Sequence, residues 1–370
     1  MAKNEKRNKD NRRRRLLLLI LLLALTLVVT AFSTYAWFTS NKKVNVEDLN
    51  VDVRAVNGLE ISADAVNWGV KIDKDDLIAN SWTGHRNQLP DSLGHVSSAK
   101  HLTGDNLLQL FDGTVATNCP DGGTDCDNPT YTLTASSASE ARCYDSDGKN
   151  NANTSQVPKC SSLEKHLMAF DIFLKVDRDD TTLYITENAG VVNTSIDDLG
   201  IKNTTRVAFV VQGNISSTEY RNGVTTGGTT TEGYVAAQAL QNGEKVIFWE
   251  PNFDAHTQTG VAAARTYYGI EGLTAGEGNS ILAYDGVATA ITTPIALTDT
   301  KASTHAGTFE PVAIDLSTPA RGASRVDSKI VLMNGVTKIR VYFWVEGQDV
   351  DTENTATGSN MKLDLELSID

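Results

Sequence analysis

Apolar residues follow two different patterns along this chain. Near the N-terminus they form one continuous run, residues 16–38, whose only polar side chains carry hydroxyl groups. At about 1.5 Å per residue, a helix of this length spans roughly 35 Å, enough to cross a bilayer core of about 30 Å. From Val44 onward, apolar and polar residues alternate in short runs, which is the pattern of half-buried β-strands. The chain is therefore predicted to carry a signal or membrane helix followed by a β-rich region.

The alternating runs predict about ten short strands. The first covers residues 44–53 and is followed by Asn57-Gly58, a dipeptide typical of hairpin turns. Stronger runs lie at residues 167–176, 182–185, 206–212, 246–249, 338–345 and 361–369. Short helices are predicted near residues 104–111 and 232–240, with a flexible low-complexity link at 223–233. These elements predict an all-β fold, an antiparallel two-sheet sandwich of the jelly-roll type.

The same pattern divides the chain into five segments. Their predicted roles are a basic cytoplasmic segment (1–15), an apolar signal or anchor helix (16–38), the first strands of the sandwich (39–73), a cysteine-containing loop insertion (74–164) and the remainder of the sandwich (165–370). The insertion is rich in Ser, Thr, Asn, Asp and Gly. Since structureless stretches of this length are uncommon inside compact domains, we interpret it as a surface excursion.

Two fates fit the apolar helix. Thr34-Tyr35-Ala36 is a small-x-small site, which favours cleavage after Ala36 and a mature chain that begins at Trp37. Alternatively the helix stays as an anchor, with Trp37, Phe38 and neighbouring aromatics at the outer interface. In both cases the basic segment holds the N-terminus inside. The rest of the chain is then exported, either secreted or held at the cell surface by residues 16–38.

Charge is distributed unevenly. The chain has a net charge of −13, while residues 1–15 carry eight basic and two acidic side chains, so the remainder is strongly acidic. Such a domain repels the phosphates of nucleic acids. We therefore expect no nucleic-acid partner, and contact with the membrane only through the N-terminal helix.

Four cysteines lie within the predicted insertion: Cys119, Cys126, Cys143 and Cys160. An even number in an exported chain indicates disulfides, and the spacings do not match zinc knuckles. Four cysteines allow three connectivities, and we expect the local pairs Cys119–Cys126 and Cys143–Cys160.

Candidate chemistry is sparse. None of the six histidines lies in a zinc-peptidase motif, and the sequence has no nucleophile elbow or phosphate-binding loop, so we expect no enzyme. Asp145, Asp147 and Asn150 resemble half of a calcium loop and form a candidate Ca²⁺ site; no other cofactor is expected. The acidic run at Asp349 and Asp351 is interpreted as a solvated turn.

Two aromatic phrases, Phe248-Trp249 and Phe343-Trp344, end predicted strands. A tryptophan at a strand end beside an acid can stack on a sugar ring, but more often it closes a hydrophobic core. Core positions are therefore favoured for both tryptophans.

The sequence from Thr34 to Lys42, TYAWFTSNK, followed by the strand at 44–53, resembles the start of the TasA/camelysin family. The phrase WVEGQD, residues 344–349, before a last strand is similar to the closing hairpin of TasA-like exported proteins. The resemblance implies a jelly-roll fold and export as a fibre-forming protein of the biofilm matrix. A strand at this end of the chain either pairs within its own sheet, as an edge strand, or completes the open edge of a neighbouring subunit. The resemblance favours the second, an assembly arm with Trp37, Phe38, Val44 and Val46.

These observations lead to one expected function and one alternative. The expected function is a non-enzymatic surface protein that forms, or decorates, an extracellular fibre, through self-association or through other cell-surface proteins. The alternative is a membrane-tethered binding module for carbohydrate or calcium.

Overall fold

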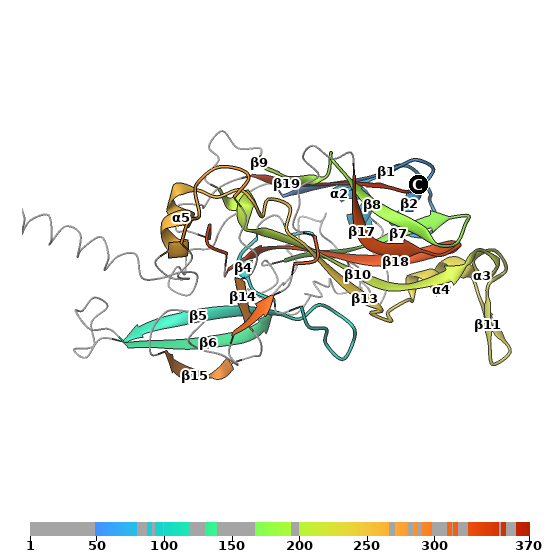
Figure 1. The fold of residues 1–370 in the computed structure, drawn as a ribbon. Coiled ribbons are helices and arrows are strands. Elements are labelled where there is room, and N and C mark those ends of the chain that lie inside the picture. Colours follow the sequence, from blue (N-terminus) through green and yellow to red (C-terminus); the bar gives the residue numbers. More distant parts are fainter. Residues whose placement is uncertain are drawn as a thin grey trace, which may run out of the picture.

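Two six-stranded β-sheets form the body of the protein (Figure 1). The computed structural model describes residues 49–79, 87–90, 93–98, 100–118, 130–138, 167–193, 200–265, 271–279, 284–287, 291–297, 309–312, 314–316, 325–347, 349–352 and 360–370. All structural statements below concern these residues. The fold is mostly β, as predicted, but its sheets are mixed and not purely antiparallel.

Sheet A has the strand order β17-β8-β19-β1-β3, and β9 also pairs with β19. Its strands are β17 (Arg325–Leu332), β8 (Thr181–Thr186), β19 (Met361–Ser368), β1 (Asn50–Val56), β3 (Lys71–Asp73) and β9 (Gly190–Asn193). The first and last long strands of the described chain, β1 and β19, lie side by side and parallel. Strands so distant in sequence need no tight turn between them, so a parallel pairing is open to them.

Sheet B has the order β13-β10-β18-β7-β2, with β4 added beside β18. Its strands are β13 (Lys245–Trp249), β10 (Thr205–Ser216), β18 (Gly335–Glu346), β7 (Leu167–Val176), β2 (Glu60–Ser62) and β4 (His95–Val96). The pairing of β18 with β4 is the second parallel one. The antiparallel prediction is thus correct for most pairings and wrong for these two.

One large core joins the facing sides of the two sheets. Alternate residues of β1 and β19 contribute from sheet A, and alternate residues of β7, β10 and β18 contribute from sheet B. Val53 and Leu365, for example, share this cluster with Phe209 and Phe343. Because side chains alternate across a strand, the period-two pattern in the sequence identifies this inner face directly in β1 and β19.

Strand β18 is buried on both faces. Phe343 and Val345 belong to the core between the sheets, whereas Tyr342 and Trp344 point the other way, into a second cluster with Phe248. The outer cluster also includes Val96, Leu108 and Leu110, which cover this face of sheet B. The core positions predicted for Trp249 and Trp344 are confirmed, since both are nearly inaccessible.

Smaller elements surround the two main sheets. The further strands are β5 (Leu110–Asn118), β6 (Thr130–Ala138) and β15 (Ile291–Leu297) in one sheet, β14 (Tyr284–Val287) with β16 (Phe309–Val312), and β11 (Val224–Thr226) with β12 (Thr229–Thr231). The helices are α2 (Lys74–Ala79), η2 (Ile201–Thr204), α3 (Ser217–Asn222), α4 (Gly233–Gln238) and α5 (Gln258–Ala263).

Three local predictions need correction. Residues 104–111 form a turn and the start of β5, not a helix, because Leu108 and Leu110 alternate onto one buried face. A short apolar run cannot by itself distinguish helix from strand. Residues 223–233 are not a flexible link, since they contain the β11–β12 hairpin. Asn57 and Gly58 have the positive φ angles of a tight turn, but the turn connects β1 in sheet A to β2 in sheet B and forms no hairpin.

The segment 74–164 also differs from the predicted surface loop. In its first half, Leu77, Leu89 and Leu93 belong to the core between the sheets, and Leu108 and Leu110 belong to the outer cluster. These residues follow no regular period, so their burial left no pattern in the sequence. Within the described residues, no helix has the length and apolar character needed to span a bilayer; residues 16–38 lie outside them.

Candidate functional site

The site residues predicted from the sequence all lie outside the described residues. They are the cleavage site Ala36 and Trp37, the arm residues Trp37, Phe38, Val44 and Val46, the four cysteines Cys119, Cys126, Cys143 and Cys160, and the calcium candidates Asp145, Asp147 and Asn150. Each of these stays a prediction. In the sequence, Cys119 and Cys126 are flanked by the described residues Asn118 and Thr130, which pair at the ends of β5 and β6.

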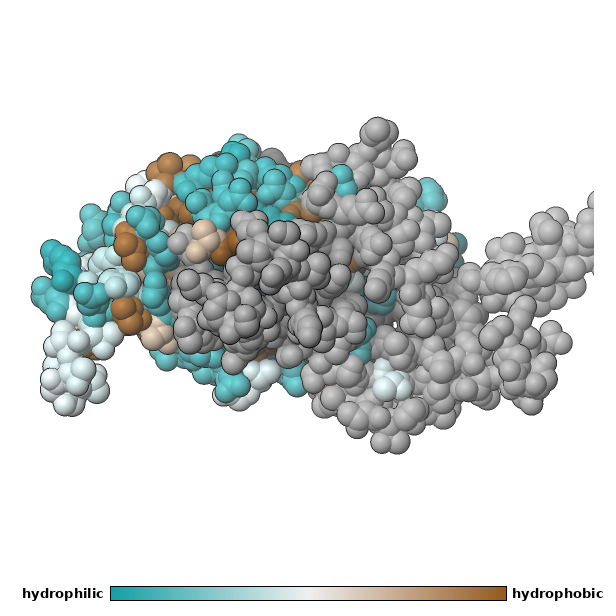
Figure 2. Space-filling view, turned by 180° about the vertical axis from the view of Figure 1, so that it is seen from behind, coloured by the Kyte–Doolittle hydropathy of each residue, from teal (hydrophilic) through white to brown (hydrophobic). Residues whose placement is uncertain are grey.

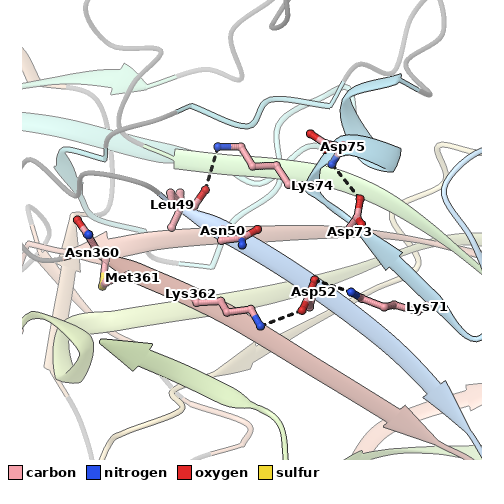
Figure 3. Close-up of a pocket in the computed structure, with 10 residues that line it drawn as sticks. All are labelled: Leu49, Asn50, Asp52, Lys71, Asp73, Lys74, Asp75, Asn360, Met361 and Lys362. Atoms are coloured by element: carbon pink, nitrogen blue, oxygen red, sulfur yellow. Dashed lines mark hydrogen bonds and ion pairs between the residues drawn. The ribbon is translucent and has the colours of Figure 1, made fainter. Parts of the chain in front are cut away.

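A groove of about 710 Å³ lies where the described chain begins (Figure 3). Leu49, Asn50 and Asp52 line it from the start of β1, and Asn360 and Lys362 line it from the start of β19. Residues of β3 and α2 complete it, and they add two bases and two acids: Lys71, Lys74, Asp73 and Asp75. Leu49 itself is buried, so the N-terminal segment joins the body at this groove.

The groove's charged side chains largely pair with one another. Lys362 Nζ lies 2.8 Å from Asp52 Oδ2 and 2.8 Å from Asp364 Oδ1, and Lys71 Nζ lies 3.4 Å from Asp52 Oδ1. Burial alone opposes ionisation of Asp52, but the two lysines outweigh it and lower the pKa of this carboxyl. The ion group therefore stabilises the fold above the ordinary carboxyl range, and this contribution is lost as the pH falls through the lowered pKa.

A second polar site is buried at one end of sheet B. Arg206, on the outer face of β10, is almost inaccessible. Its Nη2 lies 2.8 Å from Glu250 Oε1, and the same nitrogen donates to Asp349 Oδ2. The main-chain N–H of Asp351 donates to Asp349 Oδ1 (2.8 Å), which extends the network toward α5.

Asp351 connects this network to the start of α5. Its Oδ2 lies 2.8 Å from His256 Nδ1, and its Oδ1 accepts from the N–H (2.8 Å) and the hydroxyl (2.7 Å) of Thr257. The Thr257 hydroxyl in turn caps α5 by accepting from Gly260 N. A Cβ at Gly260 would lie 2.1 Å from Asp351 Oδ1, so only glycine fits there. The interpretation of Asp349 and Asp351 as a solvated turn is wrong, because both are buried.

The network has more acidic than basic groups. Its buried ionisable residues are Arg206, His256, Glu250, Glu346, Asp349 and Asp351. Burial raises the pKa of Glu250 to about 8; Arg206 opposes this change, and the neighbouring carboxylates add to it. Burial likewise raises the pKa of Asp349 against the effect of Arg206. The His256 pKa is raised because the Asp351 carboxylate outweighs the opposing effect of burial. At neutral pH Glu250 is therefore protonated.

The protonation of Glu250 predicts an unusual pH dependence of stability. Since its pKa rises from 4.5 in the unfolded chain to about 8 in the fold, its contribution is complete below pH 4.5 and is lost as the pH rises toward 8. His256 acts in the same direction, because its pKa is also raised. We expect Glu250→Gln, which keeps the shape and neutral state, to reduce the loss of unfolding free energy between about pH 5 and about pH 8, as measured by chemical denaturation.

The control is Glu244→Gln, which removes an acid on the exposed turn before β13. This variant should keep the wild-type pH profile. A Glu250→Gln profile that runs parallel to the wild type would contradict a buried, protonated Glu250.

The arrangement does not resemble an accessible catalytic site. The His256–Asp351 pair has the geometry by which a carboxylate orients an imidazole, but His256 is 7% exposed and Asp351 1%. Its ring therefore lies beyond the reach of a substrate. In the part of the chain that the structure describes, no group of three His, Cys, Asp or Glu side chains is placed to hold a metal ion. The Arg206 guanidinium, rather than a metal ion, supplies the positive charge between the Glu250 and Asp349 side chains.

One sequence signal indicates the buried ions. Arg206 directly precedes the apolar run 207–211 of β10, and Lys338 and Arg340 occupy alternate positions of β18, just before its apolar residues 341–345. On the outer face of sheet B these two side chains share one buried partner, Asp171. Asp171 Oδ1 accepts from Arg340 Nη1 (3.0 Å), and Asp171 Oδ2 lies 3.3 Å from Lys338 Nζ. A charged residue within a strand that is apolar on both sides therefore indicates a buried ion pair, although its partners cannot be named from the pattern.

Comparison with known proteins identifies no relative. No protein-family model matches the chain, and neither a curated protein nor a solved structure matches it.

Proposed function

We propose that this chain is an exported, non-enzymatic structural protein of the cell surface, a subunit or decoration of an extracellular fibre. In this proposal the two sheets form a jelly-roll-like sandwich, and the segment before β1 is an arm that completes the sheet of a neighbouring subunit. The apolar segment 16–38, the candidate cleavage site at Ala36 and the resemblance to the TasA/camelysin family support the proposal.

The observation that carries the proposal is the division of the first predicted strand, residues 44–53. Val51 and Val53 belong to the protein's own core, in a strand that pairs with β19 on one side and β3 on the other. They are therefore unavailable to a neighbour. Trp37 and Phe38, the aromatic part of the arm, precede Leu49 in the sequence, and in this proposal they belong to the donor strand.

A donor arm of this kind builds a filament. An arm that leaves one subunit and pairs with the next makes a head-to-tail contact that does not close on itself. Large aromatic side chains supply much of the energy of such contacts, which favours Trp37 and Phe38 as anchors.

Deletion of residues 37–43 from the mature protein tests this proposal. We expect the shortened subunit to fold normally, because the buried core residues that the structure describes begin at Leu49, and to form no filaments. Electron microscopy should then show filaments for the intact mature chain and none for the deletion variant.

Two matched double substitutions test whether the aromatic side chains of the arm are needed, or only its backbone. Trp37→Ala with Phe38→Ala should abolish filaments, whereas Lys42→Ala with Lys43→Ala should leave them. Filaments that form as before without residues 37–43 would refute donor-arm assembly, and so would a subunit that no longer folds without them.

The alternative, a tethered binding module, receives less support from the described aromatic residues. Trp249 and Trp344 are buried and cannot stack on a sugar. The half-buried Trp68 has Lys175 Nζ over its ring, 4.5 Å from the centroid, and its Nε1 donates to Tyr220 Oη (2.9 Å). Its indole is therefore already engaged within the protein.

A further inference from the structure

A two-stranded hairpin, β11–β12, projects from the body beside α3 and α4 (Figure 1). Its sequence, VTTGGTTT, turns at Gly227 and Gly228, both with positive φ. All residues from Thr225 to Thr231 are exposed, and Figure 2 shows the hairpin as a pale protrusion at the lower left. Because isolated two-stranded hairpins are at best marginally stable in water, pairing with a further strand would stabilise this exposed hairpin.

The free edges of the hairpin are well defined. Within the described residues no third strand pairs with β11 or β12. Thr226 pairs with Thr229 next to the two-residue turn, and Thr225 pairs with Thr230 one step further, their hydroxyls 2.9 Å apart. Around such a turn, the Thr225–Thr230 pair takes the non-hydrogen-bonded position, so its N–H and C=O groups point outward. Each edge therefore presents one donor and one acceptor of the main chain.

These edges lack the protection seen on β17, the outermost strand of sheet A. In β17 a bulge interrupts the ladder between Asp327 and Ile330, Lys329 has a positive φ, and its carbonyl accepts from Lys245 Nζ. Bulges and lysines are the usual means of preventing edge-to-edge association. The hairpin has no bulge, no proline and no charged residue between Val224 and Thr231.

The base of the hairpin is held firmly by the body. Ser216 and Glu219 form a reciprocal capping box at the start of α3, and the N–H of Gly223 donates to Glu219 O (2.8 Å). On the other side, a Cβ at Gly233 would lie 2.0 Å from Tyr220 O, so α4 packs directly on the backbone of α3. The hairpin is thus presented from a fixed base, which reduces the entropy lost on binding.

We propose that this hairpin is a self-association element that pairs edge to edge with the same hairpin of a second copy of the chain. The two hairpins form a four-stranded antiparallel sheet around a two-fold axis. The neutral hairpin favours a second copy as the partner, because it lets two strongly acidic chains meet where neither carries a charge. Threonines opposite one another across the new sheet add favourable cross-strand contacts.

The proposal rests on the proposed role in self-assembly but concerns a different contact. The arm makes a head-to-tail contact, whereas paired hairpins make a closed two-fold contact. Since the paired strands are short, we expect this contact to be weak between two free subunits and to gain strength when many copies are held in one fibre.

Sedimentation velocity over a concentration series tests the hairpin in a mature chain that lacks residues 37–43, because the arm cannot contribute to association there. With the wild-type hairpin, we expect the average sedimentation coefficient of this shortened chain to rise with concentration. Thr225→Pro with Thr230→Pro removes the outward N–H groups without removing a bond of the hairpin's own ladder, so the rise should be lost. The matched control, Thr225→Ser with Thr230→Ser, keeps the N–H groups and should associate like the wild type.

A second pair of variants guards against local damage by proline. Thr225→Lys with Thr230→Lys keeps the backbone intact and places like charges at the same edges, so it should also lose association. Association of the shortened chain that survives both the proline and the lysine substitutions overturns the proposal, and so does a shortened chain with the wild-type hairpin that shows no concentration dependence.

Electron microscopy of the shortened chain should show no filaments, although its hairpins pair. Filaments that disappear with the arm while the hairpin variants associate normally would leave the proposed function standing and reject the hairpin contact.

Discussion

Trp344→Ala is expected to destabilise the protein by about 3–5 kcal/mol, the usual cost of removing a large buried aromatic side chain. The indole is fully buried in the outer cluster of sheet B, where it packs edge-to-face on Phe248 with ring centroids 5.3 Å apart. Its Nε1 also donates to Glu346 Oε2 (3.1 Å), so the truncation leaves a buried carboxylate without this donor. Denaturant unfolding of the variant and the wild type measures the difference.

Two controls identify the source of the loss. Trp344→Phe keeps an aromatic ring but removes the donor, so its free energy of unfolding should lie between those of the wild type and the alanine variant. Val331→Ala, at a position 54% exposed on β17, should change stability by less than about 0.5 kcal/mol. A fully stable Trp344→Ala protein would show that this face of sheet B needs no covering.

The second large effect is expected from Arg206→Met. Methionine approximates the aliphatic part of arginine, but it leaves Asp349 buried without its cation and removes the partner of Glu250. Removing one member of a buried ion pair typically costs about 3–5 kcal/mol. Chemical denaturation near neutral pH should show a loss of this size.

The origin of this loss can be tested by neutralising the partners. Arg206→Met combined with Asp349→Asn and Glu250→Gln should recover much of the stability, because the uncompensated charge is then absent. The control Arg178→Met, in the exposed turn before β8, should be nearly neutral. If the triple variant is no more stable than Arg206→Met alone, unpaired charge is not the cause.

The long central strands could be predicted from local sequence because one physical rule governs them. β19 follows the alternation of apolar side chains, and β7, an apolar run interrupted only by Asp171 and Lys175, has the predicted bounds, residues 167–176. Residues 341–345 of β18 are apolar on both faces, and the outer cluster around Trp344 accounts for this. Where the alternation is short, as at residues 104–111, competing local preferences left the type of element undecided.

The buried network illustrates why a site can escape local prediction. Arg206, Glu250, His256 and Asp349 come from four separate segments of the chain, and each one alone resembles a surface residue. Their burial depends on how β10, the end of β13, the start of α5 and the turn after β18 meet. Their pKa values follow from this meeting, since desolvation acts only after the chain has folded.

The β-rich class of this protein, the inner faces of β1 and β19 and the buried tryptophans can be predicted from local sequence, because these features depend on the polarity of the side chains and on a fixed period of two. The parallel pairing of β1 with β19, the path from one sheet to the other at Asn57-Gly58 and the burial of Asp349 and Asp351 are evident only in the folded chain. The reason is that these features are set by contacts between segments far apart in the chain, whose free energy is not written in any local pattern of residues.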